Sequence, residues 1–294
     1  MKEFETRYAS KSVPVLLTDA TAHWPARKKW NLDYFEAKFN EKAVRFDNRE
    51  WKVGDFVREL KASNRDVVPY LKMVKLDEQL PELWSDVGDL ALARNNRLQS
   101  RLLPRSMRIM KGIVAVFVGT KGSGFRTLHW DYSYLHVFIS QICGDKDAVL
   151  FRPEDTPYLY PKPETENLSL LPDPFHVDLE KFPEFKHAQP IRITIREGET
   201  LFLPGGWWHA TYIGQPNVAI AESTLDRFNW GLRKHWYLSR YRQAKVPIFK
   251  RQLLNLYLSA VDKIMKLRGL LRDNGQASVT VASPDAVTTL TDVT

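Results

Sequence analysis

Between Ile109 and Ser223 the sequence divides into seven short apolar segments separated by turn residues. Segments of this length, bounded by Gly, Pro and Asp, are typical of β-strands. So many strands in little more than a hundred residues favour a closed or double-sheet β architecture, so the predicted fold is mainly β with a jelly-roll or cupin-like core. The predicted strands are 113–118, 127–131, 137–142, 148–151, 191–195, 200–203 and 217–222.

Helices are predicted before this β region. A short strand at 13–17 precedes a helix over 32–39, for which Asn31 is a good N-cap. Two further helices are expected at 54–60 and 80–84, the second with Pro81 in its first turn. Together these segments predict a core domain over residues 1–237 that carries an N-terminal helical elaboration.

After Trp236 the pattern becomes helical and predicts one amphipathic segment over 238–272. This helix could pack on the barrel, pair with a symmetry mate in a homodimer, or lie on a membrane surface. Residues 273–294 are rich in Ser, Thr, Ala and Val and contain no Lys or Arg, which predicts a disordered tail. The apolar stripe of the helix consists of Phe249, Leu253, Leu256, Ala260, Ile264, Leu267 and Leu271.

Composition narrows the class of protein. With 44% hydrophobic and 12% aromatic residues, the chain of 294 residues can bury a full core. Its one cysteine, Cys143, excludes internal disulfides and zinc-thiolate clusters, as expected in a reducing compartment. The N-terminus lacks an apolar signal core, and no apolar run approaches the roughly 20 residues needed to span a bilayer. We therefore expect an intracellular protein, cytoplasmic by default, with the nucleus left open.

The pattern His129-Trp130-Asp131, followed 78 residues after the aspartate by His209, is the strongest functional signal. On a strand, alternate residues share a face, so His129 and Asp131 would point the same way and a neighbouring strand could supply His209. Two imidazoles and one carboxylate leave metal positions open, which suits non-haem Fe(II). These residues are the predicted metal ligands.

A second His-x-Asp pattern, His176-Val177-Asp178, competes with the first. It lies in a segment, 152–190, that contains eight of the 17 prolines of the chain. Proline removes backbone donors from a strand ladder, so a rigid ligand pair is not expected there.

Positive charge is concentrated before the predicted metal site. The net charge is +8, and no acidic residue lies between Asp89 and Asp131. The segment could steer an anionic substrate, an acidic peptide or RNA, or it could be an ordinary solvated face. Its basic residues are Arg94, Arg97, Arg101, Arg105, Arg108, Lys111, Lys121 and Arg126.

Over residues 13–229 the sequence resembles the Jumonji C, or cupin-like, hydroxylases, a family of Fe(II)- and 2-oxoglutarate-dependent oxygenases built on a double-stranded β-helix. The segments that carry the resemblance are Pro14-Val15-Leu16-Leu17, His23-Trp24-Pro25, Tyr70-Leu71-Lys72, His129-Trp130-Asp131, Gln141-Ile142-Cys143-Gly144-Asp145-Lys146 and 197–209, which ends in Pro204-Gly205-Gly206-Trp207-Trp208-His209.

The resemblance implies an Fe(II) site at the three predicted ligands, with 2-oxoglutarate and O2 as co-substrates. It also implies that Lys146 binds the distal carboxylate of 2-oxoglutarate and that Tyr70 joins it. Two positions depart from the family pattern. Arg126 stands where many members have a threonine, for which Thr127 could substitute, and Val137 stands where many have an asparagine.

Three functions remain open from the sequence. The first is a hydroxylase of a protein side chain. The second is a tRNA- or nucleoside-modifying hydroxylase, suggested by the basic segment 94–126. The third is a metal-retaining binding module without turnover, suggested by Arg126 and Val137.

Overall fold

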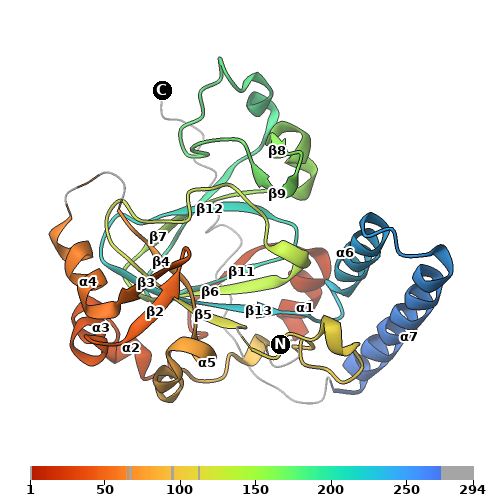
Figure 1. The fold of residues 1–294 in the computed structure, drawn as a ribbon, viewed down its shortest axis with the longest axis horizontal. Coiled ribbons are helices and arrows are strands. Elements are labelled where there is room, and N and C mark those ends of the chain that lie inside the picture. The colour runs from red at the N-terminus through yellow and green to blue at the C-terminus, as the bar shows by residue number, and fades with distance from the viewer. Residues whose placement is uncertain (1, 64, 66–67, 94–95, 112, 273–294) are drawn as a thin grey trace.

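Two antiparallel sheets that face each other form the centre of the molecule (Figure 1). The computed structural model describes residues 2–63, 65, 68–93, 96–111 and 113–272. The larger sheet has the order β1 (Val15–Leu17), β11 (Thr200–Leu203), β6 (His136–Cys143), β13 (Asn217–Thr224), β5 (Val114–Gly119) and β4 (Leu71–Lys75). The smaller sheet has the order β10 (Ile191–Ile195), β7 (Lys146–Phe151) and β12 (Trp208–Tyr212).

The predicted double-stranded β-helix is confirmed, and six of the seven predicted strands are present with ends within two residues. The exception is 127–131, where only His129 makes isolated β-bridges. Strands that were not predicted include β4, β12 and two hairpins. The hairpins are β2 (Ala43–Phe46) with β3 (Arg49–Lys52), and β8 (Pro161–Lys162) with β9 (Thr165–Ser169).

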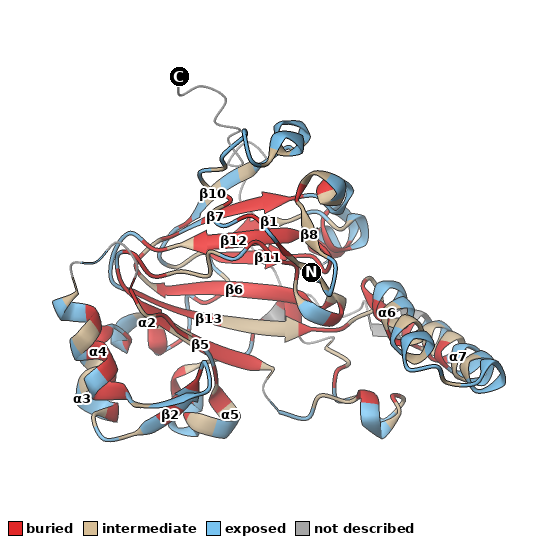
Figure 2. Ribbon diagram, turned by 45° about the horizontal axis from the view of Figure 1, so that its top comes forward, coloured by how far each residue is buried: buried red, intermediate tan, exposed pale blue. Residues whose placement is uncertain are grey.

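Side chains alternate between the two faces of each sheet, and this alternation creates separate cores. Between the sheets, Ile139 and Leu201 of the larger sheet meet Ala148 and Leu150 of β7. Figure 2 shows strands such as β6, β7 and β12 buried along most of their length, whereas the outer helices keep an exposed face.

The outer face of the larger sheet packs against the N-terminal helices. Phe4 contacts Phe202 of β11 edge-on, with ring centroids 4.8 Å apart, and Phe35 and Phe56 belong to the same core. The helices on this side are α1 (Lys2–Arg7), α2 (Ala26–Lys29), α3 (Leu32–Phe39), α4 (Val53–Ala62) and α5 (Leu76–Gln79), with short 3-10 turns η1 (Ala9–Lys11), η2 (Pro81–Asp86) and η3 (Ala91–Ala93). A further 3-10 turn, η4 (Arg105–Met107), packs with the C-terminal helices.

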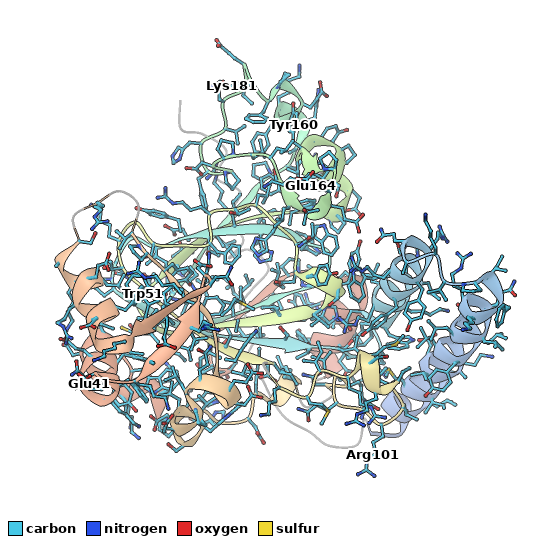
Figure 3. All side chains as sticks on the ribbon, in the orientation of Figure 1. Glu41, Trp51, Arg101, Tyr160, Glu164 and Lys181 are labelled. Carbon is cyan, nitrogen blue, oxygen red and sulfur yellow. The ribbon has the colours of Figure 1, made fainter. Side chains whose placement is uncertain are left out.

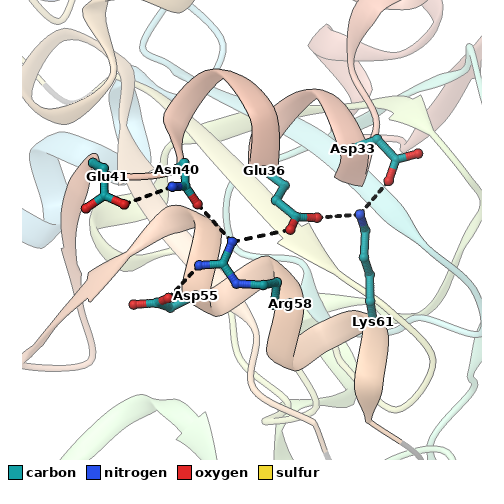
Figure 4. Close-up of polar contacts among 7 residues, drawn as sticks. All are labelled: Asp33, Glu36, Asn40, Glu41, Asp55, Arg58 and Lys61. Carbon is teal, nitrogen blue, oxygen red and sulfur yellow. Dashed lines mark hydrogen bonds and ion pairs between the residues drawn. The ribbon is translucent and has the colours of Figure 1, made fainter.

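The predicted helices at 32–39 and 54–60 are confirmed as α3 and α4, and the segment after Leu80 forms a 3-10 helix. Asn31 caps α3 as expected, because its side chain accepts a hydrogen bond of 2.8 Å from the backbone N–H of Tyr34. Exposed ion pairs join the two helices, with Arg58 and Lys61 of α4 both contacting Glu36 of α3 (Figure 4). Such pairs are screened by solvent, so the buried phenylalanines contribute more to this contact.

The outer face of the smaller sheet is covered by the proline-rich insertion 152–190. Val149, Phe151 and Trp208 of the sheet pack there against Leu159 and Leu171. Besides β8 and β9, this lobe contains η6 (Pro153–Tyr158) and η7 (Pro183–His187) and stands at the top of Figure 1. Strands β7 and β12 are therefore buried on both faces.

The predicted single C-terminal helix is wrong: the structure has two, α6 (Trp230–Gln243) and α7 (Ile248–Arg272), which form a hairpin. Leu258, Val261 and Met265 of α7 pack on Trp230 and Tyr237 of α6. The same core includes Leu98, Leu103, Met107, Leu135 and Leu225, so the hairpin shares it with the barrel domain. The predicted tail, 273–294, lies outside the described residues.

Candidate metal centre

The three predicted ligands come together at one end of the smaller sheet. His129 and His209 of β12 form a reciprocal backbone bridge, with N···O distances of 3.0 and 2.7 Å. On the other side of the segment, the N–H of Trp130 bonds the carbonyl of Asn167 in β9. Because its backbone groups are divided between two partners, 127–131 forms no continuous ladder, which corrects the predicted strand.

The geometry of the cluster fits a metal ion. One ligand atom from each of His129, Asp131 and His209 can be chosen so that all three lie within 4.8 Å of one another. The Nε2 atom of His209 is 4.0 Å from Oδ2 of Asp131. Within the described part of the chain, no other three His, Cys, Asp or Glu side chains come as close together.

Backbone carbonyls orient both imidazole rings. Nδ1 of His129 lies 2.8 Å from the carbonyl oxygen of Thr127, and Nδ1 of His209 lies 3.2 Å from that of Trp207. A ring that donates from Nδ1 presents the lone pair of Nε2, so both histidines are set to bind a metal through Nε2. Burial lowers the pKa of each imidazole to about 4, and burial raises the pKa of Asp131. The imidazoles are therefore neutral at pH 7, as metal ligands must be.

Lys146 and Tyr70 line the same cavity as the three ligands. Lys146, the first residue of β7, is buried, and its ammonium donates a hydrogen bond of 3.2 Å to the Tyr70 hydroxyl. Among the described residues, no carboxylate lies within ion-pair distance of this ammonium. Burial lowers the pKa of Lys146 to about 7 and raises the pKa of Tyr70. A buried ammonium without a counter-ion is suited to receive an anionic ligand.

The structure does not bring Thr127 into this cavity, because its side chain is exposed. Thr211 of β12 lines the cavity instead, two residues after His209 and on the same face of the strand. Sequence reasoning missed Thr211 because β12 was not predicted; alternation from His209 would have identified it. The remaining lining is largely apolar and includes Met73, Ile113, Ala115, Phe117, Phe125, Val137, Ile139 and Ala221.

The two departures from the family pattern lie in different places. Val137 lines the cavity next to Ile139, so it contributes to the apolar wall. The guanidinium of Arg126 lies over the ring of Tyr212 at 4.9 Å and lines a separate groove with Phe175 and Arg192. Arg126 is thus directed away from the cavity that holds the ligands.

The competing pair lies in the proline-rich lobe. His176 is exposed, with its Nδ1 3.4 Å from Asp173, and Asp178 pairs with Lys181. Lys181 lies near the outer tip of the lobe (Figure 3). The structure therefore separates His176 and Asp178 from the cluster of His129, Asp131 and His209.

The described basic residues before the site are dispersed. Arg101 projects into solvent at the edge of the molecule (Figure 3), whereas Arg108 donates to the backbone carbonyls of Leu103 and Arg101. Arg94 lies outside the described residues, and the stretch from Asn96 to Gln99 is not helical.

Comparison with known proteins agrees with this geometry. Residues 1–222 of the 294 match the family described as Cupin-like domain. The chain belongs to the cupin-like family. The resemblance to Jumonji C oxygenases inferred from the sequence is thereby confirmed, and the residue range matched contains all three candidate ligands.

Relatives of this cupin-like chain carry demethylase names. It is 26% identical to Lysine-specific demethylase JMJ21 of Arabidopsis thaliana over 79% of this chain and 25% of the relative. The identity is 26% with Lysine-specific demethylase 8 of Xenopus tropicalis (76% of this chain, 50% of the relative) and 25% with Arginine-specific demethylase JMJ22 of Arabidopsis thaliana (78% and 45%). The chain thus spans between a quarter and half of the length of these relatives. None of its described helices is both long and apolar enough to cross a bilayer.

Proposed function

We propose that this cupin-like chain is an Fe(II)- and 2-oxoglutarate-dependent oxygenase that hydroxylates a protein side chain. The observation that carries the proposal is the buried ammonium of Lys146, which has no carboxylate partner among the described residues and shares a cavity with His129, Asp131 and His209. A metal cluster alone would fit many functions. A cationic group at a fixed place beside it fits a dicarboxylate co-substrate.

Each residue then has a defined task. His129, Asp131 and His209 would hold the iron, and Lys146 with the Tyr70 hydroxyl would bind the far carboxylate of 2-oxoglutarate. When bound, the iron, 2-oxoglutarate and O2 together supply the oxidising equivalents that insert one oxygen atom into a C–H bond. The apolar wall excludes water and positions the substrate. Met73 lines the cavity and is exposed, so it marks the side from which a substrate can enter.

A protein substrate is favoured over RNA by two observations. The names of the relatives specify lysine and arginine, which are protein side chains. The described basic residues of the 94–126 segment are dispersed, and Arg108 and Arg126 already contact groups of the protein itself.

The decisive experiment loads the protein with Fe(II) and 2-oxoglutarate without oxygen, then admits O2 and measures succinate by NMR. We expect a visible charge-transfer band before oxygen and succinate afterwards. Asp131→Ala should abolish both, whereas His176→Ala, which changes the competing motif, should retain both. Bound iron without succinate would contradict the proposal and support the binding module.

The substrate class is tested with 18O2 and a proteome-derived peptide library. We expect mass spectrometry to find one 18O atom in a peptide side chain. Loss of a methyl group with release of formaldehyde would instead indicate demethylation, as the names of the relatives suggest. Label in tRNA nucleosides but not in peptides would overturn the protein assignment.

We also propose that the chain forms a homodimer through α7. Of the predicted stripe, Phe249, Leu253, Leu256, Ala260 and Leu267 are exposed, with Leu256 at 66%. The positions Leu253, Leu256, Ala260, Ile264 and Leu267 are spaced symmetrically about Ala260. A two-fold axis at Ala260 would place Leu253 opposite the partner's Leu267 and Leu256 opposite the partner's Ile264, which is the self-complementarity of an isologous interface.

Light scattering after gel filtration tests this assembly. We expect the mass of a dimer at micromolar concentration, and we expect Leu256→Glu to give a monomer. Asn255→Glu adds the same charge to the neighbouring exposed position and should leave the dimer intact. A monomeric wild-type protein would contradict the proposed homodimer.

A further inference from the structure

The turn that follows Asp131 has a strained backbone. Ser133 and Tyr134 have φ values of 69° and 56°, so two consecutive residues with side chains lie in the left-handed region. Residues other than glycine adopt this region at a cost, and two in succession persist only where the surroundings hold them. The turn closes on the metal ligand itself, because the N–H of Tyr134 bonds the carbonyl of Asp131 at 3.1 Å.

A buried arginine of α6 holds this turn. Arg233 is 3% exposed and donates to the hydroxyl of Ser133 and, at 3.3 Å, to its carbonyl. Its other terminal nitrogen donates to the Tyr237 hydroxyl at 2.8 Å, and that hydroxyl donates to the carbonyl of Met107. No carboxylate in the described residues pairs with Arg233. Its charge is therefore directed at polar groups of the turn and at one tyrosine.

A second side chain near the start of α6 supports the same turn. The amide of Asn229 donates to the carbonyls of Tyr134 and Thr224, at 3.1 and 3.0 Å. By contrast, the two histidine ligands are fixed by their own backbone bridge and do not depend on α6. Among the three candidate ligands, only Asp131 directly precedes a turn that side chains at the start of the C-terminal hairpin contact.

We propose that Arg233 is a positioning residue for the metal centre: it holds the 132–134 turn in the left-handed conformation that directs the Asp131 carboxylate toward His129 and His209. This inference rests on the proposed function, because it takes Asp131 as a metal ligand. It also gives the C-terminal hairpin a role in the site, since α6 supplies the guanidinium.

The test measures Mn(II) affinity of the apoprotein by calorimetry and the visible spectrum of the Co(II)-loaded protein. We expect Arg233→Met to weaken Mn(II) binding by about tenfold or more, as for other supports of metal ligands, and to change the Co(II) spectrum. Arg233→Lys, which keeps one donor, should show an intermediate loss and remains informative if Arg233→Met does not fold. Lys234→Met, which removes the neighbouring contact to Ser259, should leave both readouts unchanged.

The Leu258→Ala variant distinguishes a specific effect of Arg233 on the position of Asp131 from a general loss of protein stability. It opens the core of the hairpin without touching the turn, so it should lower the melting temperature and leave Mn(II) affinity unchanged. Wild-type affinity and spectrum in folded Arg233 variants would overturn the inference, as would an equal loss of affinity in Leu258→Ala. If the wild-type protein binds no Mn(II), Co(II) or Fe(II), the proposed function itself fails.

Discussion

At the start of β7, the Lys146 ammonium is buried beside the Tyr70 hydroxyl. This burial couples the binding of an anionic ligand to the uptake of a proton. The pKa of Lys146 is lowered to about 7, so much of the apoprotein carries a neutral amine above pH 7. The unfolded chain keeps that proton up to the ordinary lysine pKa. The unfolded state therefore binds more protons in this interval, so Lys146 makes the stability of the apoprotein rise with pH above about 7.

Binding of 2-oxoglutarate should reverse this shift, because a bound dianion favours the charged amine. We expect the metal-loaded protein to take up close to one proton per ligand at about pH 8.5 and little at about pH 6, with affinity falling as the pH rises above 7. Calorimetry in buffers of different ionisation enthalpy measures this uptake. Lys146→Arg keeps its charge, so it should bind without uptake. Wild-type binding without uptake at the higher pH would refute the linkage.

Gly205 lies in the turn between β11 and β12, directly against the backbone of Tyr134 and Leu135. A Cβ atom there would be 2.3 Å from the backbone oxygen of Tyr134, which cannot move aside as a side chain would. We expect Gly205→Ala to lower the free energy of unfolding by about 1–3 kcal/mol, as overpacking does. Urea denaturation measures the change.

The matched control for Gly205 is Gly214, in the next turn, where an added Cβ would meet no atom within 4 Å. Gly214→Ala should be neutral within about 0.5 kcal/mol, the usual range for surface changes. Equal stability of the two variants would mean that the 205–206 turn can relax. The close approach of the 205–206 turn to the 132–134 turn would then be unnecessary for the fold.

Strand β7, which is buried on both faces, could be predicted from the sequence, whereas its neighbour β12 was missed. In β12, Trp208 and Ala210, which pack under the 152–190 lobe, alternate with His209 and Thr211, which face the cavity, so the missed signal was this alternation of apolar and polar residues. The 127–131 segment, by contrast, was overpredicted. Its apolar residues are buried by contacts with two different neighbours rather than by a ladder.

The C-terminal helices show how tertiary packing decides between equivalent patterns. Pro247 separates α6 from α7, and a proline at this place is a signal for a break that the predicted single helix ignored. Helix α7 carries two apolar stripes. The predicted stripe is largely exposed, and the buried one contains Leu258, Val261 and Met265. Periodicity alone cannot tell which of the two stripes is buried, because burial depends on where α6 lies.

At the scale of the whole molecule, the candidate ligands could be proposed from the sequence, whereas the contacts that support them could not. His129, Asp131 and His209 were recognised from residue type and spacing, and Lys146 and Tyr70 from family resemblance. Thr211 was missed because β12 was not predicted. Arg233 was not found because its contact with the 132–134 turn depends on which elements meet in space. The 132–134 turn, for example, contacts α6, which begins about a hundred residues later.

The shared core between the C-terminal hairpin and the 98–107 segment predicts that the described structure unfolds as one unit. Leu258 of α7 is fully buried, so Leu258→Ala should cost about 2–5 kcal/mol and lower the single thermal transition of the whole protein. Asn255→Ala, one turn away on the exposed side, should change stability by no more than about 0.5 kcal/mol. Differential scanning calorimetry shows whether the protein unfolds in one thermal transition or in two. A separate low-temperature transition that alone responds to Leu258→Ala would mean that the hairpin unfolds independently of the barrel.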